Sequence, residues 1–157
     1  MCIRDRSGAD LSNTNLYGAN LSNTNLMAAN LSDAFLMAAN LTGTDLSSAN
    51  LDNVQATFLE ACTAAILPTN WQCVNTDPVH SPTYNLVGPS ADLNNARLGY
   101  ANLSDADLSN ANLRYAQLQY TNLTGAELTG ADLYAVDWYY TTCPDGTNSN
   151  DNGNTCE

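Results

Sequence analysis

Five cysteines are the residues of this 157-residue sequence whose chemistry is easiest to state. Cys143 and Cys156 bracket a polar, turn-rich stretch, Cys62 and Cys73 lie close together in sequence, and Cys2 is left over. Such spacings are typical of disulfides formed in an oxidising compartment, and we interpret them as the pairs Cys62–Cys73 and Cys143–Cys156. The alternative is five reduced thiols, with Cys62 pointing out of the fold and Cys73 in a loop.

The C-terminal stretch also carries oxygen atoms of the kind that calcium prefers. Its spacing is not that of an EF-hand loop, and it holds two carboxylates. The residues of this weak calcium candidate are Asp145, Asn148, Asn150 and Asp151. The alternative is a solvated tail closed by a disulfide. A zinc site is not expected, because the single histidine, His80, has no matching cysteine spacing and is interpreted as a solvated loop residue.

The sequence contains no recognisable combination of catalytic residues. A Ser–His–Asp constellation would need His80, which lies in an irregular stretch, and no glycine-rich loop opens a helix. The acidic residues recur where Asp and Asn alternate freely, which indicates a solvated surface rather than a tuned acid–base pair. The sequence therefore predicts a protein that is not an enzyme and that holds no cofactor.

The architecture that must position these side chains is indicated by a leucine at every fifth residue. A period of five fits neither a helix nor a strand, so the units must stack on copies of themselves as a solenoid. The leucines and the small residues two places before them would fill a narrow interior. This interior ladder comprises Leu11, Leu16, Leu21, Leu26, Leu31, Leu36, Leu41, Leu46, Leu51, Leu93, Leu98, Leu103, Leu108, Leu113, Leu118, Leu123, Leu128 and Leu133.

The tandem A(D/N)LXX units resemble the pentapeptide-repeat proteins over residues 9–66 and 91–138. The resemblance implies an all-β fold, a right-handed quadrilateral β-helix in which each unit forms one side and four units form a coil. Residues twenty apart would then lie above one another. Counting units predicts about five and a half coils.

The chain divides around this solenoid into five parts. We interpret the first as a truncated or non-native start, the third as an inserted loop or hairpin, and the last as a C-terminal cap with a disulfide-closed tail. The second and fourth are the two arrays of one continuous solenoid domain. In order, the parts are residues 1–6, 7–66, 67–90, 91–138 and 139–157.

Ile66 is expected to close one coil and Leu93 to open the next, so that Leu93 continues the column of Leu51. This phase predicts an acidic face of Asp10, Asp33, Asp52, Asp92 and Asp132. It also predicts a neighbouring aromatic face, a candidate contact surface, of Tyr17, Phe35, Met37, Tyr100 and Tyr120. The alternative is that these aromatics are ladders that stabilise neighbouring coils.

The formal net charge of −12 makes direct binding to nucleic acid or to an anionic membrane unfavourable. No stretch is apolar enough to insert in a membrane. We therefore expect a structural or interaction module with an unknown protein partner, or a homodimer through an end or the aromatic face. The disulfides favour a location outside the cytoplasm, with the cytoplasm as the alternative. The resemblance implies a second function, because some family members inhibit or protect DNA gyrase by mimicking duplex DNA.

Overall fold

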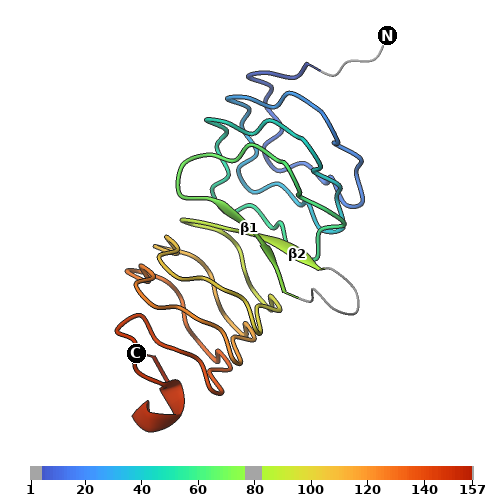
Figure 1. Ribbon diagram of the computed structural model, residues 1–157. Coiled ribbons are helices and arrows are strands. Elements are labelled where there is room, and N and C mark those ends of the chain that lie inside the picture. The colour runs from blue at the N-terminus through green and yellow to red at the C-terminus, as the bar shows by residue number, and fades with distance from the viewer. Residues whose placement is uncertain (1–4, 77–82, 157) are drawn as a thin grey trace.

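The computed structural model describes residues 5–76 and 83–156. The chain winds into a column of stacked coils, with its two termini at opposite ends of the column (Figure 1). The named elements are strand β1 (Gln72–Asn75), strand β2 (Tyr84–Val87) and the 3-10 helix η1 (Ser149–Asn152). Isolated parallel β-bridges join most of the remaining coils. The residues predicted to form the centre of the inserted loop, including His80, lie outside the described residues, as does Cys2.

Main-chain hydrogen bonds between residues about twenty apart hold the coils together. Asp10 pairs with Asn30, and Asn30 pairs in turn with Asn50. In this column the Leu11 N–H donates to the Asn30 oxygen at 2.7 Å, and the Asn30 N–H donates to the Ala9 oxygen at 2.9 Å. Because each repeat has five residues, a separation of twenty residues gives four sides to each coil.

The corners between sides are tight turns with one residue in the left-handed region. Asn13 and Asn23 take this position with φ of 56° and 55°, and asparagine tolerates it better than most residues. In the second array some of these positions hold bulky residues, such as Tyr100 and Tyr120 with φ of 63° and 59°. Both tyrosines are exposed at these corners.

The interior is narrow and filled by leucine and alanine. Thirteen of the eighteen ladder leucines are buried, whereas those nearest the ends of the column are partly buried. The partly buried members are Leu11, Leu16, Leu21, Leu128 and Leu133. The buried side chains form two separate clusters, one in each array. Burial of a leucine side chain contributes about 2 kcal/mol, so each array has its own source of stability.

An antiparallel hairpin of β1 and β2 separates the two arrays and lies at mid-height of the column (Figure 1). Its strands pair from Gln72 opposite Val87 to Asn75 opposite Tyr84. The hairpin is attached to the first array, because Tyr84 pairs with Leu59 in an antiparallel bridge. The hairpin thus extends the sheet of the last complete coil of the first array.

Trp71 joins the two cores, since it packs against both hydrophobic clusters. Its indole lies directly on Gly88, where the Cβ atom of any larger residue would collide with the ring. The Cys62–Cys73 disulfide ties β1 to the preceding coil. This disulfide was predicted, and it is present.

The second array is one side out of phase with the prediction. The Asn53 N–H donates to the Ser90 oxygen at 2.8 Å, and the Asp92 N–H donates to the Val54 oxygen at 3.1 Å. In the first array the Thr14 oxygen accepts from Phe35 in the same way. Residues 87–91 therefore form an extra side that lacks the leucine. As a result, Leu93 lies below Ala56 rather than below Leu51, and the expected continuity of the Leu51 column is wrong.

The end of the first array also differs from the prediction, because it contains one extra residue. Asn40 pairs with Ala61 and Asp45 pairs with Ile66, and both separations are twenty-one residues. The extra residue turns Ile66 outward, where it is 56% exposed, and brings Cys62 inward, where it is buried. The expectation that Cys62 points outward, which belonged to the reduced alternative, is therefore wrong.

Both outer boundaries of the ladder lie beyond the predicted ones. Asp5 pairs with Asn25, so the ladder includes residues that we assigned to a non-native start. At the other end Thr142 pairs with Asn122, and Cys143 is buried in the position that leucine takes elsewhere. The solenoid therefore reaches Cys143 rather than ending at residue 138.

The contact between Gly88 and Trp71 predicts a sensitive site. The substitution Gly88→Ala is expected to lower the free energy of unfolding by about 1–3 kcal/mol, because the rigid indole must move. Gly99→Ala is the matched control, because its nearest neighbours are Gln119 oxygens at 3.3–3.4 Å. Urea unfolding measures both variants. Equal effects at the two positions would contradict the role of Trp71 as the joint.

Candidate interaction surface

The residues of the predicted aromatic face lie in two places. Tyr17 packs on Phe35 with ring centroids 6.3 Å apart, and both belong to the first array. Tyr100 and Tyr120 form a separate stack in the second array. Because the second array is out of phase by one side, the two groups do not share a face. The single aromatic face that included Met37 is therefore wrong.

The second array instead carries a larger aromatic group, which we call the tyrosine cluster: Tyr100, Tyr120, Tyr139 and Tyr140. Tyr120 lies parallel to Tyr100 at 4.9 Å and parallel to Tyr140 at 5.6 Å. Tyr139 meets Tyr120 and Tyr140 edge-on. Tyr100 is 74% exposed, and the other three rings are also exposed. Partial desolvation of the Tyr120 phenol by the surrounding rings raises its pKa, and the electrostatic effect of the neighbouring tyrosines raises it further.

Tyr139 and Tyr140 were missed as surface residues, because the sequence analysis assigned them to the C-terminal cap. Trp138 is buried in the core of the second array. Tyr140 takes the corner position of its repeat, as Tyr120 does one coil earlier, with φ of 53° and 59°. The twenty-residue spacing from Tyr100 through Tyr120 to Tyr140 was the sequence signal that identifies the stack.

A second aromatic group surrounds Arg114. Its guanidinium lies 4.4 Å from the centre of the Tyr134 ring and 5.8 Å from that of Tyr115. The same group donates a hydrogen bond to Asp132 at 3.0 Å. This pairing raises the pKa of Arg114, and the pKa of Asp132 is lowered by the Tyr134 N–H and by Arg114. The charge of Arg114 is therefore engaged within the protein.

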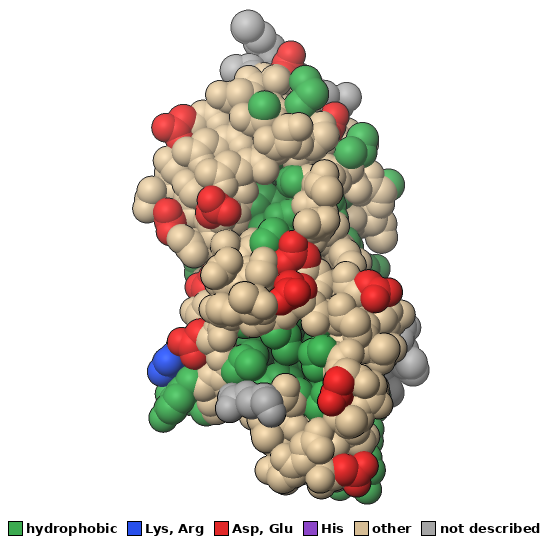
Figure 2. Space-filling view, turned by 90° about the vertical axis from the view of Figure 1, so that its left-hand side faces the viewer, with side chains coloured by type: hydrophobic (Ala, Val, Ile, Leu, Met, Phe, Trp, Pro, Cys, Tyr) green, Lys and Arg blue, Asp and Glu red, His purple; other side chains and the backbone are tan. Residues whose placement is uncertain are grey.

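The predicted acidic face is also divided by the phase of the second array. Asp10, Asp33 and Asp52 lie on one side of the first array, whereas Asp92 lies below Gln55 on the adjacent side. Asp132 pairs below Asn112 in that second column. Acidic side chains are scattered over the side of the molecule in Figure 2, where basic side chains are scarce. The continuous acidic face that the sequence predicted is therefore wrong.

Many of the carboxylates have a structural task in their own turn. The Ser47 N–H and hydroxyl both donate to Asp45 Oδ1, at 2.9 and 2.6 Å. The hydroxyl of Ser47 and then its N–H lower the pKa of Asp45. Hydrogen bonds from the residue two places later in the chain lower the pKa of six carboxyls: Asp10, Asp45, Asp107, Glu127, Asp132 and Asp145.

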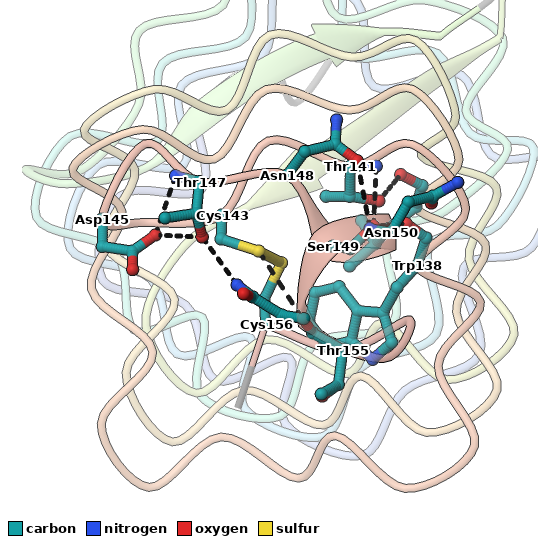
Figure 3. The surroundings of a disulfide bond; sticks show 12 residues. Trp138, Thr141, Cys143, Asp145, Thr147, Asn148, Ser149, Asn150, Thr155 and Cys156 are labelled. Atoms are coloured by element: carbon teal, nitrogen blue, oxygen red, sulfur yellow. Dashed lines mark hydrogen bonds between the residues drawn. A yellow bond between two sulfur atoms is a disulfide. The ribbon is translucent and has the colours of Figure 1, made fainter.

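The tail closes the C-terminal end through the predicted disulfide between Cys143 and Cys156, which is present (Figure 3). Ser149, the buried first residue of η1, donates its N–H to the Thr141 oxygen at 2.9 Å. The Ser149 hydroxyl donates to the Trp138 oxygen. The tail is thus fixed to the last coil by main-chain contacts as well as by the disulfide.

The calcium candidates do not converge on one point. Asp145 accepts the Thr147 N–H, Asn148 accepts the Asn150 N–H, and Asn150 accepts the Tyr140 N–H, at 2.8–3.0 Å. Asp145 and Asn150 lie on opposite sides of the disulfide in Figure 3. Across residues 5–76 and 83–156, no group of three His, Cys, Asp or Glu side chains is placed to hold a metal ion. Asp145, Asn148 and Asn150 thus accept hydrogen bonds within the C-terminal end, and calcium binding by these residues and Asp151 stays a prediction.

A family model described as pentapeptide repeats matches the chain in eight copies, over residues 7–43, 28–55 and 91–130. The chain belongs to the pentapeptide repeat family. Together the matched ranges cover more than half of its length, and the hydrogen-bonded coils agree with the right-handed β-helix of this family. No curated protein matches the sequence.

Solved structures of family members resemble the chain at low superposition scores. A pentapeptide repeat protein from the Arabidopsis thaliana thylakoid lumen is 21% identical, with a TM-score of 0.32; the match covers 85% of this chain and 64% of that one. HetL, involved in heterocyst differentiation regulation in the cyanobacterium Nostoc sp. strain PCC 7120, is 30% identical, with a TM-score of 0.33 and coverages of 92% and 63%. The chain thus spans less than two thirds of either protein.

QnrB1, a plasmid-mediated fluoroquinolone resistance protein, is 17% identical, with a TM-score of 0.34 and coverages of 85% and 69%. At these TM-scores none of the three superpositions carries an argument about function.

The lowered carboxyl pKa values predict loss of stability in acid. A carboxyl whose pKa is lower in the folded state stabilises the fold above its ordinary pKa, which is 3.8 for Asp, and this contribution is lost as the pH falls through the folded value. We therefore expect a constant melting temperature between about pH 7 and pH 5 and a steep fall below about pH 4.

Two matched serine variants test whether hydrogen bonds to carboxylates cause this loss of stability in acid. Ser47→Ala removes the hydroxyl on the carboxylate of Asp45, so it should reduce the fall in melting temperature between about pH 5 and pH 3. Ser22→Ala removes the equivalent hydroxyl on the amide of Asn20, which does not titrate, so its effect should be independent of pH. The same pH dependence in both variants would contradict the assignment.

Proposed function

We propose that the protein is a non-enzymatic interaction module that binds a basic protein through the tyrosine cluster. The observation that carries this proposal is the ordered, exposed stack of Tyr100, Tyr120 and Tyr140, with Tyr139 packed against it. Tyrosine is enriched in the energetically important centres of protein interfaces. Rings that are already held by one another lose little conformational freedom on binding.

The charge of the protein supports a basic partner. The chain has 16 acidic and 4 basic residues, and two of the basic residues, Arg97 and Arg114, lie over aromatic rings. Beside the tyrosine cluster, Asp137 accepts a hydrogen bond from the Gln119 amide at 2.6 Å. A field of this sign increases the rate of encounter with positively charged surfaces.

The two disulfides support a location outside the cytoplasm, where such bonds form and persist. None of the helices in the described part of the chain is long and apolar enough to cross a membrane. The partner we propose is therefore a basic protein of an oxidising compartment.

Mimicry of duplex DNA toward DNA gyrase is the second candidate, and the net charge of −12 favours it. A DNA mimic presents charge at regular intervals along its length, because duplex DNA carries about one charge per 1.7 Å. Here the carboxylate columns change sides between the two arrays, as the position of Asp92 below Gln55 requires. The divided charge and the disulfides give this candidate less support than the tyrosine cluster gives the first.

The tyrosine cluster predicts a specific loss of binding. Immobilised protein should retain basic proteins from an extract of an oxidising compartment, and the double variant Tyr100→Ser with Tyr120→Ser should retain them at least about tenfold less, which corresponds to about 1.4 kcal/mol. Tyr17→Ser is the matched control, since this exposed tyrosine lies outside the cluster.

Three outcomes would contradict the proposal. Equal retention by the double variant would exclude the tyrosine cluster as the binding surface. Self-association that the double variant abolishes would identify a homodimer through these rings instead. Inhibition of gyrase supercoiling that the double variant leaves unchanged would favour the DNA-mimic function.

A further inference from the structure

A groove opens where the two arrays meet, on the side of the column that carries Phe35 and Gln55. Phe35 pairs with Gln55, and Asp92 pairs with Asn112, but no bridge within the described chain pairs Gln55 with Asp92. The Asp92 N–H still donates to the Val54 oxygen at 3.1 Å, but among the described residues no Ala56 N–H bond to the Asp92 oxygen matches the bond from Leu16 to Phe35. The ladder between the two arrays is therefore incomplete at this level.

The groove between the two arrays has a volume of about 350 Å³. It is open to solvent and large enough for a small organic group. We call it the junction groove; its principal lining residues are Asp33, Phe35, Asn53, Gln55, Asp92 and Asn112.

The lining of the junction groove presents hydrogen-bond acceptors. The Asn53 amide donates to Asp33 Oδ1 at 3.3 Å, and the Asn112 amide donates to Asp92 Oδ1 at 2.9 Å. These bonds use one N–H of each amide. They leave Oδ2 of Asp33 and Oδ2 of Asp92 without a partner among the described residues. No Arg or Lys side chain lines the groove within the described chain.

Phe35 supplies an aromatic wall to the same space. Its ring is half-buried and packs against Tyr17 of the preceding coil at 6.3 Å. Phe35 is thus held in place on one side while it lines the groove between its own coil and the second array. A cation near such a ring is attracted by the negative face of the π-system.

We propose that the junction groove binds a protonated amine. An ammonium group has three donors and no acceptor, so it complements the free oxygen of either Asp33 or Asp92, and its carbon chain fits against Phe35. A neutral polyol lacks the positive charge that would complement the two carboxylates. The amine comes either from a free aliphatic diamine or from a lysine side chain of a partner. This site is separate from the tyrosine cluster and does not depend on it.

The test uses the oxidised full-length protein and putrescine as the probe, followed by the side-chain amide signals of Asn53, Gln55 and Asn112 in NMR titrations. Saturable shifts of these signals are expected, and 1,4-butanediol, which lacks the charge, should give none. Nα-acetyl-lysine methylamide is the second probe. Tighter binding of this compound than of putrescine assigns the groove to lysine side chains, and the reverse assigns it to free amines.

Substitutions distinguish a site from general attraction to an acidic protein. Asp33→Asn and Asp92→Asn should each weaken putrescine binding at least about tenfold, and Phe35→Leu about threefold. Asp10→Asn removes the same charge outside the groove, so it should change binding less than about twofold. Asp33 is exposed, so its variant tests the groove even if Asp92→Asn disturbs the fold. Equal weakening by Asp10→Asn, equal shifts with 1,4-butanediol, or displacement of putrescine by an equal concentration of calcium would overturn the proposal.

Discussion

The hydrogen-bond ladder between residues twenty apart is the constraint on which the rest of the structure depends. Each coil satisfies the main-chain groups of the next, as Leu11 and Asn30 illustrate at 2.7 Å. This leaves an interior only wide enough for one leucine and one small residue from each side. Extra residues therefore cannot be accommodated inside. They must project from the column, as the hairpin does, or change which side the following repeat occupies.

A projecting segment and a change of side both occur at the junction of the two arrays. The hairpin of β1 and β2 takes over part of the ladder, and the partly buried Trp71 packs against both otherwise separate cores. The side formed by residues 87–91 then shifts the second array by one position. This shift separates aromatic and acidic residues that a continuous count places together, and it opens the junction groove. The surface chemistry of the protein follows from this one interruption.

The features that repeat every five residues could be predicted from the sequence. The leucine ladder, the four-sided coil and both disulfides follow from residue spacing and from the family resemblance. The phase could not be predicted, because the side at residues 87–91 has Gly88 where the others have leucine. The inward turn of Cys62 depends on a single extra residue in the weakened repeats before it. The extent of the tyrosine cluster was missed because Tyr139 and Tyr140 follow a buried tryptophan and were assigned to the C-terminal cap.

The phase of the second array is the central claim, and scalar couplings across main-chain hydrogen bonds test it most directly. In isotope-labelled, oxidised protein, the Asp92 amide nitrogen should couple to the Val54 carbonyl, and the Asn53 amide nitrogen to the Ser90 carbonyl. If the arrays were instead in phase, the Asp92 amide would couple to the Ala49 carbonyl, as Asn50 couples to Ala29 one coil earlier. That result would return Leu93 to the column of Leu51 and would remove the junction groove.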